Sequence, residues 1–305
     1  MGRGSYTAGD WAKLKSSRGI NQSNTVENIF TSNVARKEYN TAYIIARESR
    51  DTDSASESTP VIIGFDVTAS MGYLAKELSV NAVNKTVTKL YEQKPISCPQ
   101  VLCAAIGDSL CDETPLQVTQ FEADIRIIKQ LTDLYLEGGG GGNNGESYNL
   151  LWYFAAKHTQ TDCYEKRGKK GFLFSIGDDQ CHPQLSADEI KRVFSDDVSY
   201  PLSNEELIRM AEKKFHLYHI CIETDGAYNA EAVRKWQQLM PGRTTVIQKK
   251  DIRYLADLIL AIIRVGAGMT PNESLKMIDQ DIAEILARSM AFIDPVKETN
   301  NIISF

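Results

Sequence analysis

The 305-residue sequence lacks the features that mark several large classes of protein. It has 34 Lys and Arg residues against 40 Asp and Glu, a formal net charge of −6, so it lacks the basic excess with which nucleic-acid-binding proteins neutralise phosphates. No apolar run approaches the ~20 residues that a transmembrane helix needs. No apolar signal-peptide core follows the N-terminal charges. We therefore expect a cytoplasmic protein that binds neither nucleic acid directly nor a membrane.

Cysteine and histidine are also sparse. The six cysteines form no C-x-x-C pair, and only four histidines occur in the whole chain. Zinc sites draw mainly on nitrogen and sulfur ligands, and secreted disulfide frameworks on closely spaced cysteines, so the composition favours neither. Cys181 and His182 stand beside Asp178 and Asp179, but the rest of that cluster offers only oxygen ligands.

After Pro60, apolar strand-like runs alternate with stretches of helical periodicity. Continuous apolar runs are typical of strands buried on both faces. The alternation predicts an α/β fold, a doubly wound, mostly parallel, Rossmann-like sheet flanked by helices, with N- and C-terminal extensions. The expected strands span 61–66, 101–106, 116–121, 171–177, 216–222 and 244–248, and the expected helices span 73–93, 125–136, 148–158, 204–215, 230–239, 252–265 and 272–292.

The same patterns divide the chain into three parts. Residues 61–266 form the predicted sheet domain, and residues 267–305 a helical extension that packs on its own domain or docks on a partner. Residues 1–60 are polar and have little periodicity, so we interpret them as an arm. The arm is either disordered alone or ordered on another subunit, since it carries apolar residues that a plain linker does not need: Trp11, Ile20, Ile29, Phe30 and Tyr43.

Acidic residues end two of the expected strands. Asp66 follows the first apolar run, and Thr68 and Ser70 come two and four residues later, so one tight loop can turn three oxygens toward one point. Asp178 ends the apolar run 171–177. In doubly wound sheets, ligands lie beyond the carboxyl ends of the strands. Hard cations prefer oxygen ligands, so the sequence predicts a Mg²⁺ site here, with Mn²⁺ or Ca²⁺ as alternatives. The competing interpretation is that Thr68 and Ser70 only cap the following helix.

The segment from Val61 to Gly72 resembles the first motif, D-x-S/T-x-S, of the von Willebrand factor A domain, whose metal-ion-dependent adhesion site (MIDAS) lies at the carboxyl edge of a doubly wound sheet. Ile176-Gly177-Asp178 is similar to the third motif of that family, in which the acid faces the ion. The segment 176–182 resembles an intracellular, bacterial or phage-like variety. This resemblance implies a metal-binding interaction domain over about two thirds of the chain.

The second motif departs from the adhesive members of the family, which present a Thr before a helix. The equivalent loop, 138–148, reads GGGGGNNGESY and contains no Thr. Glu146 is therefore the best candidate for the third ligand position, with Ser147 second. Asp66, Glu146 and Asp178 would bring about −3 to one point, which makes an empty site costly and favours a cation.

Enzymatic interpretations of these residues are weaker. Gly140, Gly142 and Gly145 satisfy G-x-G-x-x-G, but the preceding residues read as helix and no acid ends a strand about 20 residues on. Thr68 stands where a D-x-D phosphotransferase needs its second Asp, and no Walker motif occurs. We therefore expect a protein that is not an enzyme. A metal-dependent hydrolase is an alternative, since bound Mg²⁺ can activate water.

The sequence thus predicts a scaffold or interaction protein that binds a partner carboxylate through a cation held by Asp66, Thr68, Ser70, Glu146 and Asp178. If Glu146 fills the position of the partner's carboxylate, the ion is structural and binding uses the rim of the site. The resemblance implies partners such as an AAA+ ATPase or another subunit of a multi-component stress or defence system. A self-assembling structural protein, a homo-oligomer held by its terminal arms, is a further alternative.

Overall fold

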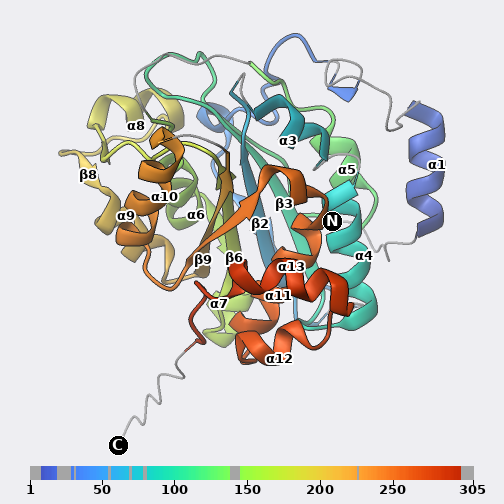
Figure 1. Cartoon of the computed structure of the whole chain (residues 1–305). Helices are drawn as coiled ribbons and strands as arrows, with labels where there is room; N and C mark the ends of the chain where they lie inside the picture. Colours follow the sequence, from blue (N-terminus) through green and yellow to red (C-terminus); the bar gives the residue numbers. More distant parts are fainter. Residues whose placement is uncertain are drawn as a thin grey trace, which may run out of the picture.

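The computed structural model describes residues 8–18, 29–30, 32–53, 56–68, 71–77, 81–137, 145–224 and 227–296. Its centre is a six-stranded sheet in the order β10-β9-β6-β2-β3-β4 (Figure 1). All neighbouring strands are parallel except β4, which runs antiparallel to β3 at the edge. The strands are β2 (Thr59–Asp66), β3 (Pro99–Ile106), β4 (Leu116–Val118), β6 (Gly171–Gly177), β9 (Phe215–Glu223) and β10 (Thr244–Gln248).

This strand order confirms the predicted fold class. Counted along the chain within this sheet, the strands lie in the order 3-2-1-4-5-6, which is that of a doubly wound sheet. The chain builds outward from β2 through β3 to β4, then crosses to β6 on the other side and builds outward again. The order therefore reverses between β2 and β6. Ligands of such sheets bind at this switch point, beyond the carboxyl ends of the two strands.

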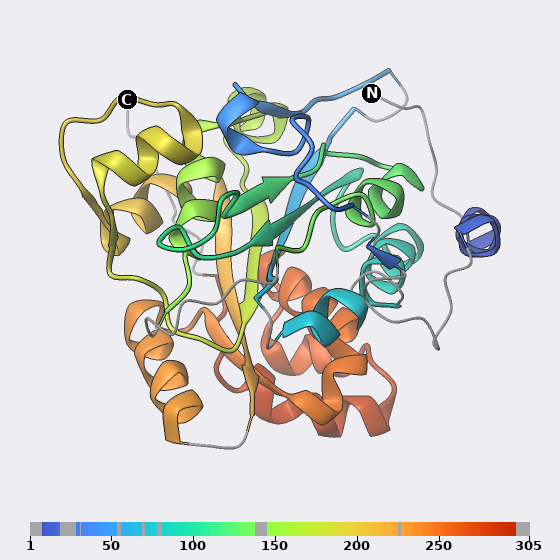
Figure 2. The ribbon, with the colours of Figure 1, turned by 90° about the horizontal axis from the view of Figure 1, so that it is seen from above.

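Helices cover both faces of the sheet (Figures 1 and 2). Along β2, Val61, Ile63 and Phe65 face one apolar cluster and Ile62 faces the other, as the alternation of side chains along a strand requires. The first face is covered by α3 (Gly72–Glu77), α4 (Val83–Gln93), α5 (Arg126–Leu131), α11 (Leu255–Gly266) and α13 (Gln280–Met290), and the second by α6 (Asn149–Lys157), α8 (Ala187–Phe194), α9 (Asn204–Ala211) and α10 (Ala227–Leu239).

Local sequence signals account for the starts of two helices on the second face. The predicted capping box of Ser203 and Glu206 is present at α9. Helix α8 also begins with a capping box, formed by Ser186 and Glu189, which we did not predict from the sequence. Gly64 lets α6 approach β2, because a Cβ there would lie 2.4 Å from the Leu151 side chain.

Several predicted elements differ in extent. The helix expected over 73–93 is described as α3 and α4, and residues 78–80 between them lie outside the described part. The strand expected over 116–121 ends at Val118. The single helix expected over 272–292 is wrong: α12 (Pro271–Leu275) and α13 are separate, because Asp279 takes an extended backbone conformation between them. No helix in the described part of the chain is long and apolar enough to cross a membrane.

Described parts of the N-terminal segment contact the sheet domain of the same chain, which neither interpretation of the arm anticipated. β1 (Arg47–Ser49) pairs in parallel with β5 (Thr159–Thr161). The Tyr39 carbonyl accepts a hydrogen bond from the N–H of Val118 in β4. Trp11 of α1 (Ala8–Arg18) and Phe30 are buried, Tyr43 is 62% exposed, and Ile20 lies outside the described residues. The division at residues 60 and 266 stays a prediction.

The C-terminal helices also pack on their own chain. Leu286 and Met290 of α13 and Ile293 beyond it are buried in the same apolar cluster as α11. The hydroxyl of Ser289 donates a hydrogen bond to the Val246 carbonyl of β10. The described part of the C-terminal extension packs against its own domain, which is one of the two roles that we considered for it.

Candidate metal centre

Asp66 ends β2 at the switch point, and its side chain is completely buried. Its Oδ1 accepts hydrogen bonds from the Thr68 N–H at 2.8 Å and from the Thr68 hydroxyl at 2.7 Å. Its Oδ2 accepts one from the Tyr148 hydroxyl at 2.9 Å. Burial raises the pKa of Asp66 to about 7, although these hydrogen bonds act to lower it. The carboxylate is therefore held in one orientation.

Glu146 lies between the glycine-rich loop and α6, where backbone bonds fix it beside the loop that follows β6. Its N–H donates to the Gln180 carbonyl at 2.9 Å, and its carbonyl accepts from the His182 N–H at 3.1 Å. The residue is 6% exposed, and its Oε2 has no hydrogen-bond partner among the described residues. Burial, followed by the charges of Asp66 and Asp108, raises its pKa to about 10.

Asp178 follows β6 directly, across the switch point from Asp66. Its carbonyl accepts a hydrogen bond from the Asn229 side chain at 2.9 Å, and the next carbonyl, of Asp179, accepts one from the Trp236 indole at 2.8 Å. Helix α10 thus fixes this loop. Burial and then the charge of Asp179 raise the pKa of Asp178, while Lys249 lowers it.

The structure brings Asp66 into electrostatic contact with both Glu146 and Asp178. The charge of Asp178 raises the pKa of Asp66, and the charge of Asp66 raises that of Glu146. Thr68 is placed beside Asp66 through its hydroxyl, and Ser70 lies outside the described residues. The candidate metal-ligand atoms described here are oxygens. The Oε2 of Glu146, which has no hydrogen-bond partner among the described residues, is a buried acceptor that a cation would satisfy.

The carboxylates do not form a complete site by themselves. Among the described residues, no group of three or more His, Cys, Asp or Glu side chains is arranged so that it could hold a metal ion. A cation at this edge would therefore need hydroxyl groups or water in addition to carboxylates. This agrees with a ligand set that includes Thr68 and Ser70.

Sequence reasoning missed Tyr148, which links the two strands of the switch point. Its buried hydroxyl reaches Asp66 at the end of β2, and its ring lies over Gly177 at the end of β6. A Cβ at Gly177 would lie 1.9 Å from that hydroxyl, so only glycine fits there. The Tyr148 ring also packs edge to face against the rings of His219 and Trp236, with 5.2 and 5.3 Å between ring centroids.

Ser147 belongs to a second group of polar residues, distinct from the candidate metal site. Asp108, fully buried after β3, accepts a hydrogen bond from His182 Nε2 at 2.8 Å. The Ser147 hydroxyl bonds with Ser109 at 2.8 Å and with Asp108 at 3.3 Å. Ser147 therefore serves the Asp108 loop, whereas Glu146 is coupled to Asp66. Through its bond with Asp108, His182 ties the loop after β6 to the loop after β3.

Comparison with known proteins adds little to this geometry. No protein family and no curated protein matches the sequence. The pilus adhesin SpaC from Lactobacillus rhamnosus GG is similar in structure, with 6% identity, 73% of this chain and 32% of that chain covered, and a TM-score of 0.48. A von Willebrand factor type A protein from Catenulispora acidiphila is also similar in structure, with 14% identity, 70% of this chain and 42% of that chain covered, and a TM-score of 0.37.

A third similar structure is proximal thread matrix protein 1 from the mussel byssus with a zinc-occupied MIDAS motif. It has 10% identity, 67% of this chain and 47% of that chain covered, and a TM-score of 0.41. The chain thus spans a third to a half of each of these three proteins. Likenesses this distant carry no conclusion about function, which has to come from the site itself.

Proposed function

We propose that this chain is an interaction or scaffold protein whose sheet edge holds a divalent cation and binds a carboxylate of a protein partner. The observation that carries the proposal is the set of three acids at the switch point, one of which, Glu146, keeps a buried carboxylate oxygen that has no hydrogen-bond partner within the described part of the chain. An uncompensated buried acceptor costs about 1–3 kcal/mol, so the arrangement favours a bound cation.

The residues have distinct roles in this proposal. Asp66 is the pre-oriented ligand, because Thr68 and Tyr148 hold both of its oxygens. Glu146 offers its Oε2 from the opposite loop, directly or through water. Asp178, which is partly exposed, is the acid nearest to solvent. Oxygen donors of this kind suit Mg²⁺, with Mn²⁺ or Ca²⁺ as alternatives, and a bound cation would supply positive charge for an incoming carboxylate.

The charge of the site decides between two modes of binding. If Asp66, Glu146 and Asp178 are all ionised ligands, a divalent cation leaves about −1, and a further carboxylate is repelled. The ion is then structural and partners use the rim. If Glu146 is neutral, Asp66 and Asp178 balance the cation and carboxylate capture is favoured.

We propose a binding role and no catalytic one. A metal-dependent hydrolase would need a general base near the cation. The histidine of the loop after β6, His182, is already hydrogen-bonded to Asp108. By resemblance we propose as partner an AAA+ ATPase or another subunit of a cytoplasmic multi-protein system. Self-association through the terminal segments remains a second candidate for assembly, although their described parts pack on their own chain.

Calorimetric titration of Mg²⁺ and Mn²⁺ into chelator-treated protein tests the cation site. We expect one ion per chain in the wild type, and loss of binding in Asp66→Ala and Glu146→Gln. Glu165→Gln is the control, because Glu165 is an exposed acid of α7 (Asp162–Arg167), which precedes the start of β6 and so lies toward the opposite end of that strand from Asp178, and it is paired with Arg50. Absence of binding in the wild type would overturn the proposal.

A further inference from the structure

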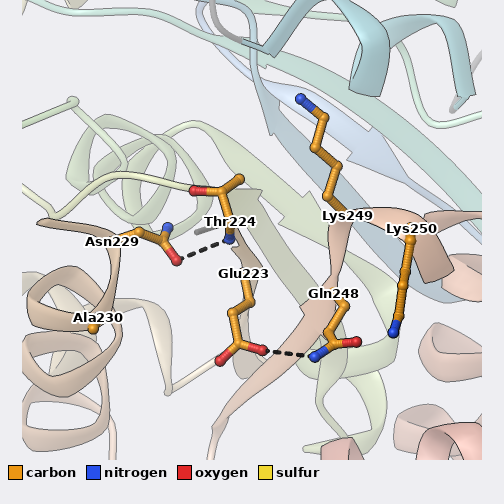
Figure 3. Close-up of a pocket in the computed structure, with 7 residues that line it drawn as sticks. All are labelled: Glu223, Thr224, Asn229, Ala230, Gln248, Lys249 and Lys250. Carbon is orange, nitrogen blue, oxygen red and sulfur yellow. Dashed lines mark hydrogen bonds between the residues drawn. The ribbon is translucent and has the colours of Figure 1, made fainter. Parts of the chain in front are cut away.

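A pocket of about 820 Å³ opens at the same edge of the sheet as the three acids (Figure 3). It lies between the carboxyl ends of β9 and β10, the first turn of α10 and the start of η4 (Lys249–Tyr254). Its lining includes Glu223, Thr224, Asn229, Gln248, Lys249 and Lys250.

Most of the polar groups in this pocket are already used. Glu223 accepts a hydrogen bond from Gln248 at 3.3 Å and pairs with Arg288 at 2.9 Å. Asn229 accepts a hydrogen bond from the Thr224 N–H at 3.0 Å and donates to the Asp178 carbonyl at 2.9 Å. Asn229 therefore ties the pocket wall to the loop of the metal candidate.

The feature of the pocket that is available to a ligand is its positive charge. Lys250 is exposed and forms no ion pair with any described residue. Lys249 is exposed beside it, and its charge reaches Asp178. The two side chains extend in different directions from the start of η4, Lys249 toward the centre of the sheet edge and Lys250 away from it (Figure 3). This local excess of positive charge stands out in a chain whose net charge is −6.

The sheet sets the distance from this pocket to the metal candidate. The switch point lies between β2 and β6, and the pocket lies between β9 and β10, two strand positions farther along the order β2-β6-β9-β10. Neighbouring strands are about 4.8 Å apart, so the separation is roughly 10 Å. Because Lys250 extends away from the centre of the sheet edge (Figure 3), an extended peptide reaches from the cation to this lysine in about four residues, at roughly 3.3 Å each, and residues four apart carry their side chains on the same face.

From this placement we infer that the partner presents an extended acidic segment with two carboxylates four residues apart, one at the cation and the other at Lys250 in the pocket. This inference rests on the proposed function, because it assigns the partner of the same edge. The cation fixes the first acid, and the pocket selects partners by the position of the second.

Fluorescence anisotropy with labelled nonapeptides tests the inference on the full chain at saturating Mg²⁺. One peptide carries glutamates at its third and seventh positions in a Gly/Ser background, a second replaces the latter glutamate by glutamine, and a third has the two glutamates adjacent. On the wild type we expect the first peptide to bind about fivefold more tightly than the other two, the size of one solvent-exposed ion pair. Lys250→Glu should abolish this advantage, so that the first peptide binds the variant no more tightly than the other two.

The control variant is Lys213→Glu, which makes the same change of net charge two residues before β9, at the opposite edge of the sheet. It should keep the fivefold advantage. Equal binding of all three peptides to the wild type, or an advantage that survives Lys250→Glu, would overturn the inference alone. If the one-glutamate peptide binds equally with Mg²⁺ and with chelator, the proposed function itself is wrong, and the inference is lost with it.

Discussion

The hydroxyl of Tyr148 donates a 2.9 Å hydrogen bond to Oδ2 of Asp66, although 82 residues separate the two along the chain. Both side chains are fully buried, so water cannot replace the bond. The contact joins the first helix turn after the glycine-rich loop to the end of β2. It fixes the acid on which the proposed cation site is centred.

Tyr148→Phe should lower the free energy of unfolding by about 1–3 kcal/mol, the cost of leaving a buried carboxylate oxygen without its donor. Urea denaturation of the chelator-treated protein measures this loss. Tyr153→Phe is a matched control on the same helix, since that hydroxyl also donates to a carboxylate, of Asp196. Asp196 is 34% exposed and also bonded by His158, so the control should lose less and bind Mg²⁺ normally. An equal loss in both variants would contradict our account of the site.

Gly177→Ala should destabilise the protein by about 1–3 kcal/mol or more, because the new Cβ would overlap the Tyr148 hydroxyl, 1.9 Å away. Thermal unfolding measures the effect, and the variant should also weaken cation binding because Tyr148 has to move. The control, Gly168→Ala, meets no atom within 4 Å and has a φ of 62°. It should cost only the backbone strain, about 1–2 kcal/mol, and leave cation binding intact.

Glu146→Gln should stabilise the cation-free protein by about 1–3 kcal/mol, because burial and neighbouring acids raise the pKa of Glu146 to about 10, so folding has to protonate this group, which a neutral amide does not require. Urea unfolding with chelator present measures this gain. The same variant should gain no stability from added Mg²⁺, whereas the wild type should. A less stable Glu146→Gln protein in chelator would show that the carboxylate has a structural partner.

The stability of the protein should depend on pH through His219, which is completely buried, stacked on Trp236 at 3.4 Å between ring centroids, and bonded to Ser175 at 2.8 Å. Burial lowers its pKa well below 6.5. As the pH falls below about 6.5, the unfolded chain binds a proton there that the folded chain cannot, so this residue makes unfolding easier, by up to about 1.4 kcal/mol per pH unit.

Urea midpoints of the wild type and His219→Gln between pH 7.5 and 5 measure that contribution. The acids of the sheet edge act in the opposite sense, because their raised pKa values favour the folded state as the pH falls. The comparison between the two proteins removes their effect. His216, whose pKa burial lowers to about 4, acts in the same sense as His219 and is unchanged in the variant. Parallel pH profiles would show that His219 is not the source.

The sequence predicted those parts of the structure that depend on neighbours along the chain. The apolar runs before Asp66 and Asp178 are strands because parallel strands covered on both faces have no polar side to interrupt them. The capping box at Ser203 is a four-residue signal, and it is present. Both acids could be placed at one edge because the carboxyl ends of parallel strands coincide.

The missed features depend on contacts between distant residues. In the sequence, Tyr148 marks only the start of an expected helix, and Asp108 and His182 are 74 positions apart. The pairing of β1 with β5 involves three residues from each strand, too few to leave a pattern. The break between α12 and α13 is set by the backbone of Asp279, inside a stretch whose apolar spacing is helical throughout.

The contact of the N-terminal segment with β4 also protects the molecule from association. β4 is the last strand on its side of the sheet, and an exposed edge strand is a template for pairing with another copy. Asn40 bridges to Gln117, and Tyr39 accepts the Val118 N–H, so the chain covers its own edge. A protein shortened before Arg47 would expose these backbone groups and should aggregate through β4. The segment interpreted from its composition as an arm, disordered alone or ordered on another subunit, thus covers, in its described part, the edge strand of its own sheet.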